Sequence, residues 1–175
     1  NSIIAKIWDG KMIVRFDDTN PTKEKTEYVD SILSDLKTMK IDYWKITFTS
    51  DYFLLLIKLC ENLIRSESAY VEDTPREQMK KERLERTESK NRNNSVDKNL
   101  SMWSKMINAE EPFIVRIKLD MKSTNGCLRD PVIYRVGNGE PHLRTENQFK
   151  IYPTYDFAIP IVDTVEGVTN SFRSA

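Results

Sequence analysis

Two adjacent carboxylates, Asp17 and Asp18, stand between a short apolar run and Asn20-Pro21, a pair typical of the start of a helix. Ligands of open α/β sheets bind beyond the carboxyl ends of the strands, so this position suits a ligand site. The two carboxylates could accept hydrogen bonds from a cationic group or hold a metal. The alternative is structural: Asp18 and Thr19 cap the turn, as such residues commonly do, while Asp17 pairs with Arg15.

Aromatic and basic side chains near the end of the sequence form a second candidate site. Residues 151–157 read IYPTYDF, and a tyrosine hydroxyl in a cleft can orient a polar ligand. At near-helical spacing the same rings are also typical of a core. Arg173 ends a small polar run, and an arginine at a strand end can bind a carboxylate through two hydrogen bonds, although a surface arginine is commoner.

Other kinds of site find little support in the sequence. The single histidine, His142, would have to serve any Ser-His-Asp or Cys-His centre alone, and we expect it to be solvated in its glycine-containing loop. Together with Cys60 and Cys127 it offers at most three zinc ligands of these types, without CxxC spacing. The sequence also contains no phosphate-binding loop of the GxGxxG or Walker type.

The elements that must position the first candidate site alternate between strand and helix. Residues 11–16 form a β-branched run that predicts a buried strand, and residues 21–40 carry apolar side chains at helical spacing. A second short strand is expected at 46–49. A second helix follows from Ser50 or Asp51, and its apolar stripe recurs every three or four residues. This order is typical of a parallel α/β architecture.

The chain then changes character. Residues 76–94 are charged and polar with almost no apolar period, and within them Asn91–Asn94 is loop-like. Residues 113–119 and 132–136 alternate apolar and mostly polar side chains and predict two antiparallel strands. The simplest organisation is an α/β core interrupted by an antiparallel insertion at 71–148.

From residue 149 the sequence becomes apolar again. It predicts a helix-like segment near 154–166 and a last strand from Gly167. Pro160 argues against an uninterrupted helix, because proline removes a backbone donor and clashes with the preceding turn.

Composition sets the broad class. The 175 residues suffice for one domain, or one domain with an insertion, and a 10% aromatic content argues against wholesale disorder. Two cysteines favour free thiols in a reducing compartment. The longest apolar run, Phe53–Ile57, is too short for a membrane helix, and we expect no signal peptide. Because the chain opens on Asn1, we expect it to be a piece of a longer protein.

The charges cancel but are unevenly distributed. With 27 basic and 27 acidic residues, the chain lacks the excess of an indiscriminate nucleic-acid binder. Residues 1–75, however, carry 10 basic and 13 acidic side chains, whereas residues 76–92 and 112–150 each carry 7 basic and 4 acidic ones. The basic excess therefore lies on the expected insertion, where it favours contact with phosphates.

Six motifs follow one another along the chain: RFDDTNP at 15–21, SDYF at 50–53, AYVEDT at 69–74, LRDPVIYR at 128–135, IYPTYDF at 151–157 and DTVEGVT at 163–169. Their order and spacing resemble the catalytic domain of class I glutamyl-tRNA synthetases of the eukaryotic cytosolic type. Glutaminyl-tRNA synthetases share most of these motifs.

The resemblance implies a fold and an activity. The fold is α/β, a Rossmann-like class I core formed by residues 1–70 and 149–175 and interrupted by an α+β acceptor-stem-binding insertion at 71–148. The activity is that of a cytoplasmic glutamate–tRNA ligase, which uses ATP with Mg²⁺ to convert glutamate to glutamyl-adenylate. The enzyme then transfers the amino acid to the 3′ end of tRNA(Glu).

The resemblance also assigns residues. Asp17 matches the acid that contacts the α-ammonium of the amino acid, with Arg15 beside it at a substrate-binding position. Tyr155 matches a tyrosine that contacts the substrate amino acid, and Ser174 falls at a hydroxyl position near ATP. Arg173 matches the residue expected to bind the γ-carboxylate. A buried arginine needs a carboxylate partner, so an amide substrate would leave its charge uncompensated. No catalytic residue and no metal ligand are assigned.

The tRNA-binding residues expected on the insertion are Arg116, Lys118 and Arg129. Two features depart from the family pattern: Asn170 stands where many relatives have histidine, and neither ATP-binding signature, HIGH or KMSKS, occurs in these residues. We therefore expect a fragment that is inactive alone. A glutamine–tRNA ligase and a non-catalytic synthetase-derived module that binds tRNA or protein stay open as alternatives, as does assembly with other synthetases or accessory proteins.

Overall fold

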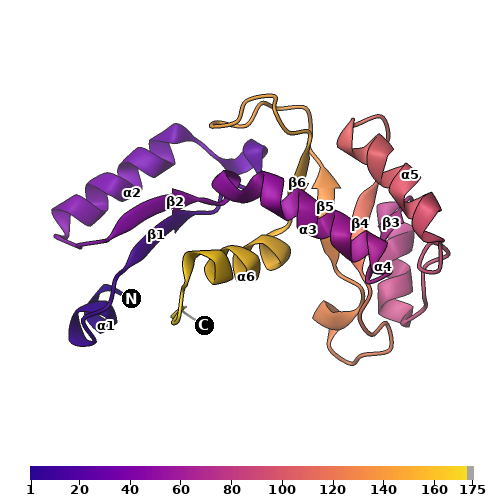
Figure 1. The fold of residues 1–175 in the computed structure, drawn as a ribbon, viewed down its shortest axis with the longest axis horizontal. Coiled ribbons are helices and arrows are strands. Elements are labelled where there is room, and N and C mark those ends of the chain that lie inside the picture. Colours follow the sequence, from indigo (N-terminus) through magenta and orange to yellow (C-terminus); the bar gives the residue numbers. More distant parts are fainter. Residues whose placement is uncertain (173–175) are drawn as a thin grey trace.

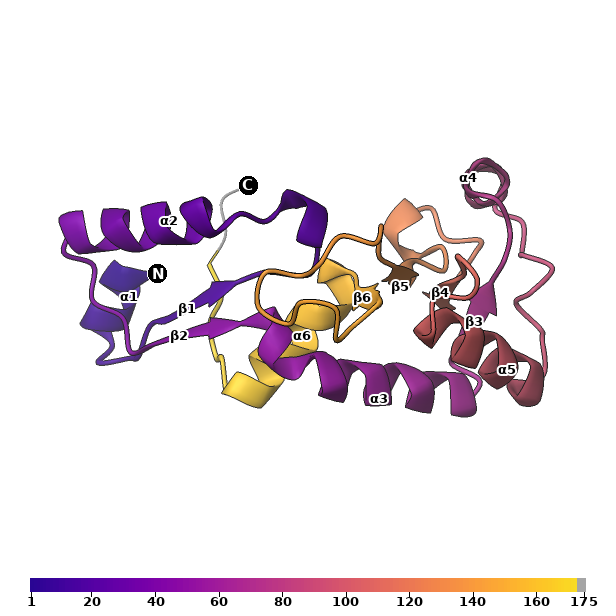
Figure 2. The ribbon, with the colours of Figure 1, turned by 90° about the horizontal axis from the view of Figure 1, so that it is seen from above.

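The computed structural model describes residues 1–172, so Arg173 and Ser174 lie outside the described part of the chain. The molecule is elongated, with one small sheet towards each end and two helices, α3 and α6, in the middle (Figure 1). Seen from above, α2 lies along one side of the molecule and α3 along the other (Figure 2). None of the described helices is both long and apolar enough to cross a membrane.

The first sheet contains two parallel strands, β1 (Ile13–Phe16) and β2 (Lys45–Phe48), with Val14 opposite Ile46. The predicted parallel arrangement of this part is confirmed. The short helix α1 (Ser2–Ile7) precedes β1.

A crossover joins the two parallel strands. The 3₁₀ turn η1 (Pro21–Lys23) begins it, and α2 (Thr26–Thr38) follows. The apolar positions of α2 have helical spacing as predicted, but none of its residues is buried, and Tyr28 is 55% exposed. The apolar period therefore predicted the helix correctly, but it did not predict that the apolar face would stay uncovered in this chain.

The second sheet has four antiparallel strands in the order β3 (Ala69–Glu72), β4 (Ile114–Ile117), β5 (Val132–Val136) and β6 (Ile151–Pro153). The predicted antiparallel pair is confirmed as β4 and β5. The outer strand β3 begins before the expected insertion at 71–148, and β6 lies after it. The sheet therefore contains residues from both sides of that segment.

The charged stretch 76–94 contains a helix, α4 (Arg76–Glu85), and α5 (Val96–Ile107) follows it. No helix was predicted over α4, because a helix that buries no residue needs no apolar period in its sequence. It consists largely of Glu, Lys, Gln and Arg, which are good helix formers without a packed face. Asn91–Asn94 lies outside both helices, as predicted.

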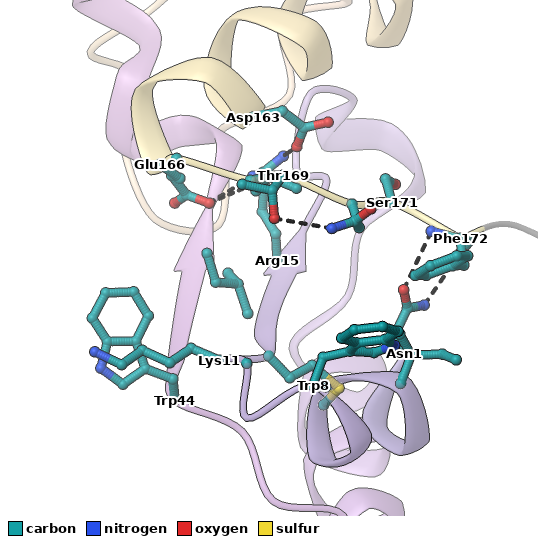
Figure 3. Close-up of a pocket in the computed structure, with 18 of the residues that line it drawn as sticks. Asn1, Trp8, Lys11, Arg15, Trp44, Asp163, Glu166, Thr169, Ser171 and Phe172 are labelled. Atoms are coloured by element: carbon teal, nitrogen blue, oxygen red, sulfur yellow. Dashed lines mark hydrogen bonds and ion pairs between the residues drawn. The ribbon is translucent and has the colours of Figure 1, made fainter.

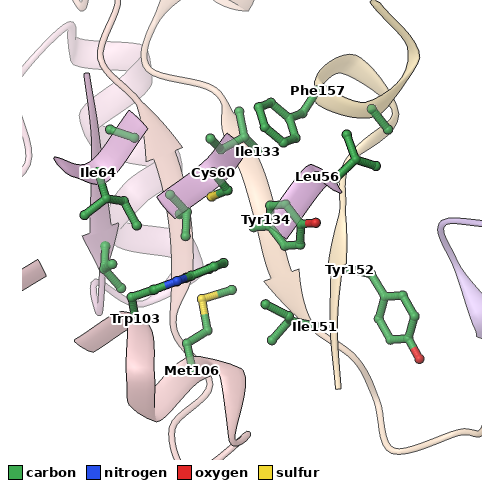
Figure 4. Packing of buried hydrophobic residues seen from close by; sticks show 14 of the residues in the cluster. Leu56, Cys60, Ile64, Trp103, Met106, Ile133, Tyr134, Ile151, Tyr152 and Phe157 are labelled. Atoms are coloured by element: carbon green, nitrogen blue, oxygen red, sulfur yellow. The ribbon is translucent and has the colours of Figure 1, made fainter. Parts of the chain in front are cut away.

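The hydrophobic core lies between α3 (Phe53–Arg65) and the four-stranded sheet, preceded by the 3₁₀ turn η2 (Thr49–Tyr52). The predicted apolar stripe of α3 is confirmed, since Phe53, Leu56, Cys60 and Ile64 are all buried. Trp103 of α5 meets the ring of Tyr134 edge-on at 5.7 Å, as the packing in Figure 4 shows. These rings join α5 to the centre of the sheet.

The helix α6 (Tyr155–Glu166) is continuous through Pro160, so the predicted interruption is wrong. Proline at the sixth helical position deprives the carbonyl of Asp156 of its partner, but both residues are exposed and water can replace it. Gly167, with φ of 71°, ends the helix in the left-handed conformation.

The last strand predicted from Gly167 is also wrong for the residues described, because 168–172 run without a sheet partner. The segment is instead tied to the start of the chain. The Phe172 amide donates to the side chain of Asn1, whose Nδ2 donates back to the Phe172 carbonyl at 3.2 Å.

Candidate active site

A cleft of about 1120 Å³ opens where β1, α1, α6 and the segment after α6 meet. Arg15 and Asp17 line it from the carboxyl end of β1, and Tyr155, Asp163 and Glu166 line it from α6. The three substrate-binding residues predicted within the described chain, Arg15, Asp17 and Tyr155, thus share one cavity, although Tyr155 follows Arg15 by 140 positions in the sequence. Figure 3 shows Arg15 directed at the acidic end of α6.

Arg15 is held by two carboxylates of α6. Its Nε and Nη2 donate to Glu166 Oε2 at 3.0 and 2.6 Å, and its Nη1 donates to Asp163. Burial acts to lower the pKa of Arg15, but these hydrogen bonds and charges outweigh it and raise the pKa. The alternative in which Asp17 pairs with Arg15 is wrong, because Asp163 and Glu166 occupy the guanidinium.

Glu166 is the acceptor on which several donors converge. Its side chain is fully buried, and besides Arg15 it accepts a hydrogen bond from Tyr52 Oη at 2.9 Å, with Lys45 Nζ 3.7 Å away. Burial alone would raise the pKa of Glu166, but hydrogen bonds from Arg15, Tyr52 and Thr47 lower it. In return, burial and the bond to Glu166 raise the pKa of Tyr52 to about 12. Glu166 therefore stays anionic and ties β1, β2 and η2 to α6.

The two adjacent carboxylates have different roles. Asp18 is buried and accepts a hydrogen bond from the Ser50 amide at 2.8 Å and another from the Ser50 hydroxyl, so it fixes η2 rather than capping its own turn. Asp17 is exposed and faces the cleft. Lost hydration and the charge of Asp18 raise the pKa of Asp17, opposed by hydrogen bonds from Thr19. Only Asp17 is available to a cationic ligand group.

The aromatic motif at 151–157 divides in the same way. Tyr152 and Phe157 are buried in the core, as the structural reading predicts. Tyr155 stands at the start of α6, is 41% exposed and lines the cleft, where its hydroxyl can orient a polar ligand. The segment carrying Asn170 also lines the cleft, just before Arg173 and Ser174.

Arg116 does not lie on the surface, contrary to the expectation that it meets tRNA. Its side chain is fully buried, with Nη1 3.0 Å from Glu72 Oε2 and Nε 2.8 Å from the carbonyl of Asp130. Alternation along β4 correctly placed Arg116 opposite the core face, but the loop around Met121 covers this second face of the sheet. A local pattern could not reveal that cover.

The other two basic candidates differ from Arg116. Lys118 follows β4 and is partly exposed. Arg129 is partly exposed too, and its guanidinium donates to the carbonyls of Ser123, Arg83 and Thr124 at 2.7 to 3.0 Å. Both keep a positive charge near the surface of the insertion.

Sequence reasoning missed two features of the site. Asp163 and Glu166 are three residues apart on α6, a spacing that places both acids on one helix face and could have indicated a cationic partner. His142 was expected to be solvated and is instead 1% exposed, with its ring beside Asp18. Among residues 1–172, His, Cys, Asp and Glu side chains form no group of three or more suited to a metal ion.

Glu24 gives the site a pH-dependent stability. Its Oε1 accepts a hydrogen bond from the Asn20 amide at 2.7 Å, whereas Oε2 is buried without a hydrogen-bond partner. Burial, followed by the charges of Asp18 and Asp17, raises the pKa of Glu24 to about 7. The folded chain therefore holds a proton here that the unfolded chain releases near pH 4.5. This stabilisation is complete below pH 4.5 and is lost as the pH rises through about 7.

We expect Glu24→Gln to remove that dependence. Thermal unfolding is measured between pH 5 and 8. As the pH rises, the free energy of unfolding of the variant should increase relative to that of the wild type by roughly 1–3 kcal/mol. Glu27→Gln, at an exposed position of α2, is the matched control and should follow the wild type. A difference between Glu24→Gln and wild type that does not change with pH would contradict this account.

The comparisons with known proteins agree with this geometry. The family described as tRNA synthetases class I (E and Q), catalytic domain, matches residues 1–175. The bifunctional glutamate/proline–tRNA ligase of Drosophila melanogaster is 52% identical over 99% of this chain and 10% of its own length. The cytoplasmic glutamate–tRNA ligases of Arabidopsis thaliana and Saccharomyces cerevisiae are 49% and 48% identical over 100% and 99% of this chain, each over 25% of its own length.

The chain thus spans between a tenth and a quarter of these relatives. The match to the family nevertheless extends over residues 1–175 of this chain. This chain therefore belongs to the family of class I tRNA synthetase catalytic domains for glutamate and glutamine.

Proposed function

We propose that this chain is part of a cytoplasmic glutamate–tRNA ligase. The observation that carries the proposal is the convergence of Asp17 and Tyr155 on one cleft at the carboxyl end of β1, in a chain of the class I family. On this proposal β1 and β2 belong to a Rossmann-like core made by residues 1–70 and 149–175. Relatives named as cytoplasmic glutamate–tRNA ligases support both the reaction and the compartment.

The cleft offers complementary groups to an amino acid. The Asp17 carboxylate would accept hydrogen bonds from the α-ammonium group, and the Tyr155 hydroxyl would orient it. The α-carboxylate would then attack the α-phosphorus of ATP, releasing pyrophosphate and forming glutamyl-adenylate. Transfer to a ribose hydroxyl of the tRNA would release AMP. Mg²⁺ would enter with the triphosphate, and Ser174 is proposed to lie near ATP.

Arg15 supports this site indirectly. Its donors face Asp163 and Glu166, so we propose that it positions the end of β1 and leaves Asp17 to the substrate. Selection of glutamate over glutamine is assigned to Arg173, which would pair with the γ-carboxylate. An amide in that place would leave the guanidinium uncompensated.

The experiment uses the full-length protein that contains this chain. It should charge tRNA with glutamate and not with glutamine, and Arg173→Cys should lower glutamate-dependent pyrophosphate exchange by roughly 100-fold or more. Glutamate exchange that survives the substitution would remove Arg173 from the site. Charging with glutamine would instead identify a glutamine–tRNA ligase, and no charging at all would leave a non-catalytic module.

Residues 71–148 are proposed to receive the acceptor stem of tRNA(Glu). The support is the basic excess of 76–92 and 112–150, with Lys118 and Arg129 partly exposed on the second half. Arg116 belongs to the folding of this unit, because a buried arginine paired with Glu72 cannot reach a phosphate. The naming of some relatives as bifunctional glutamate/proline ligases suggests assembly with another synthetase activity as a further proposal.

The insertion proposal predicts a selective effect of charge reversal. Lys118→Glu in the full-length protein should raise the KM for tRNA several-fold, since one phosphate contact contributes to the electrostatic affinity, and should spare the KM for glutamate. Lys58→Glu, on the exposed face of α3, makes the same change of charge away from the insertion and should have no effect. Equal effects of the two substitutions, or none, would contradict the placement.

A further inference from the structure

His142 is the one histidine of the sequence, and the proposed chemistry gives it no task. It lies in the loop that joins β5 to β6, and its side chain is fully buried. The ring nitrogens are distinguishable by their partners. The amides of Arg144 and Thr145 both donate to Nδ1, each at 3.1 Å, so Nδ1 carries the lone pair. The proton is therefore on Nε2, which donates to the carbonyl of Asp18 at 2.8 Å.

The surroundings hold the ring in this orientation. It stacks on Tyr152 with an interplanar angle of 17°, and Phe53 meets it edge-on at 5.5 Å. Asp18 Oδ2 and Glu24 Oε2 lie 3.6 and 3.7 Å from Nε2, beyond hydrogen-bond distance. With two amides donating to Nδ1 and a carbonyl accepting at Nε2, the ring is held as the tautomer with its proton on Nε2.

The carbonyl that His142 binds belongs to the turn that carries Asp17. Asp18 and Thr19 are buried, and the Asp18 carboxylate is bound by the backbone and hydroxyl of Ser50. Asp17 is the preceding residue, and it is the one carboxylate of the pair that faces the cleft. The Asp18 carbonyl lies in the peptide unit that joins Asp18 to Thr19, so its direction fixes the ψ angle of Asp18 and with it the path of the turn that begins at Asp17. A hydrogen bond to that carbonyl from a residue 124 positions away holds the turn against rotation.

We propose that His142 is a positioning residue for the amino-acid substrate, acting through the Asp18 carbonyl to hold Asp17 towards the cleft. The inference rests on the proposed function, since it needs Asp17 to bind the ammonium group. It adds that a loop of the insertion, through one buried hydrogen bond, completes the amino-acid site of the α/β part. The residue is not catalytic, because nothing places its ring against the reacting atoms.

The test compares three substitutions in the full-length enzyme. His142→Gln retains an amide donor near the position of Nε2, His142→Asn offers its amide only near Nδ1, and His142→Phe keeps the ring without either nitrogen. We expect the KM for glutamate to rise roughly fivefold to tenfold in the Asn and Phe variants, because each of them loses one buried hydrogen bond. The KM for ATP and for tRNA should stay within about twofold of wild type. The Gln variant should recover most of the loss.

Leu143→Ala, at the exposed neighbouring position, is the matched control and should behave as wild type. Parallel changes of all three KM values that follow the unfolding temperature would overturn the proposal, because they would make His142 a general support of the fold. A Gln variant no better than Phe would overturn it too. If His142→Phe fails to fold, the Gln and Asn comparison decides alone. Wild-type charging with glutamate is measured separately, so failure of the proposed function is distinguishable.

Discussion

The candidate site depends on one buried charge arrangement, Arg15 of β1 bound by Asp163 and Glu166 of α6. Between these two elements the chain forms a complete second sheet and the four helices α2 to α5, so nothing local brings them together. A partly buried guanidinium is stable only with compensating carboxylates, and Glu166 is wholly buried and needs a cation in return. The ion pair satisfies both charges and holds the end of β1 against α6. Asp17 and Tyr155, which belong to these two parts of the chain, therefore line the same cleft.

A second set of polar contacts, some of them buried, joins the turn after β1 and η2 to the loop between β5 and β6. Asp18 accepts hydrogen bonds from Ser50, and His142 reaches back to the Asp18 carbonyl. Arg144 from the same loop donates to Ser50 Oγ at 2.6 Å and to Asp51 Oδ1 at 2.7 Å, and its guanidinium lies 4.0 Å over the ring of Phe48. These contacts are directional, so they fix the geometry of the turn more closely than apolar packing alone.

Much of the architecture was predictable because the spacing of apolar residues along the chain indicates it. The α3 stripe, the parallel β1–β2 pair and the β4–β5 hairpin all follow patterns of apolar residues. Two features escaped these patterns. The mostly polar α4 has no apolar period to detect, and Pro160 is tolerated because its side of α6 faces solvent. Whether the outer face of a helix or strand contacts water or protein depends on the tertiary structure, and a local sequence pattern does not predict it.

The site residues show the same division. The motifs indicated Asp17 and Tyr155, and the structure brings both to the cleft, where their substrate roles stay proposals. The burial of Arg116 and His142 was missed, because each is covered by a loop distant in sequence. Polar residues read as surface groups by default. Here two of them serve as internal donors.

The central claim is that the Arg15–Glu166 pair assembles the cleft, and a double-mutant cycle tests it most directly. Unfolding free energies are measured for Arg15→Met, Glu166→Gln and the double variant in the full-length protein, together with the KM for glutamate. Each single substitution should cost about 3–5 kcal/mol and raise that KM, because it removes the main partner of a buried charge and leaves Arg15 only Asp163, or Glu166 only Tyr52 and Lys45. The double variant should lose clearly less free energy of unfolding than the two single variants lose together. Additive losses, or an unchanged KM for glutamate, would contradict the account.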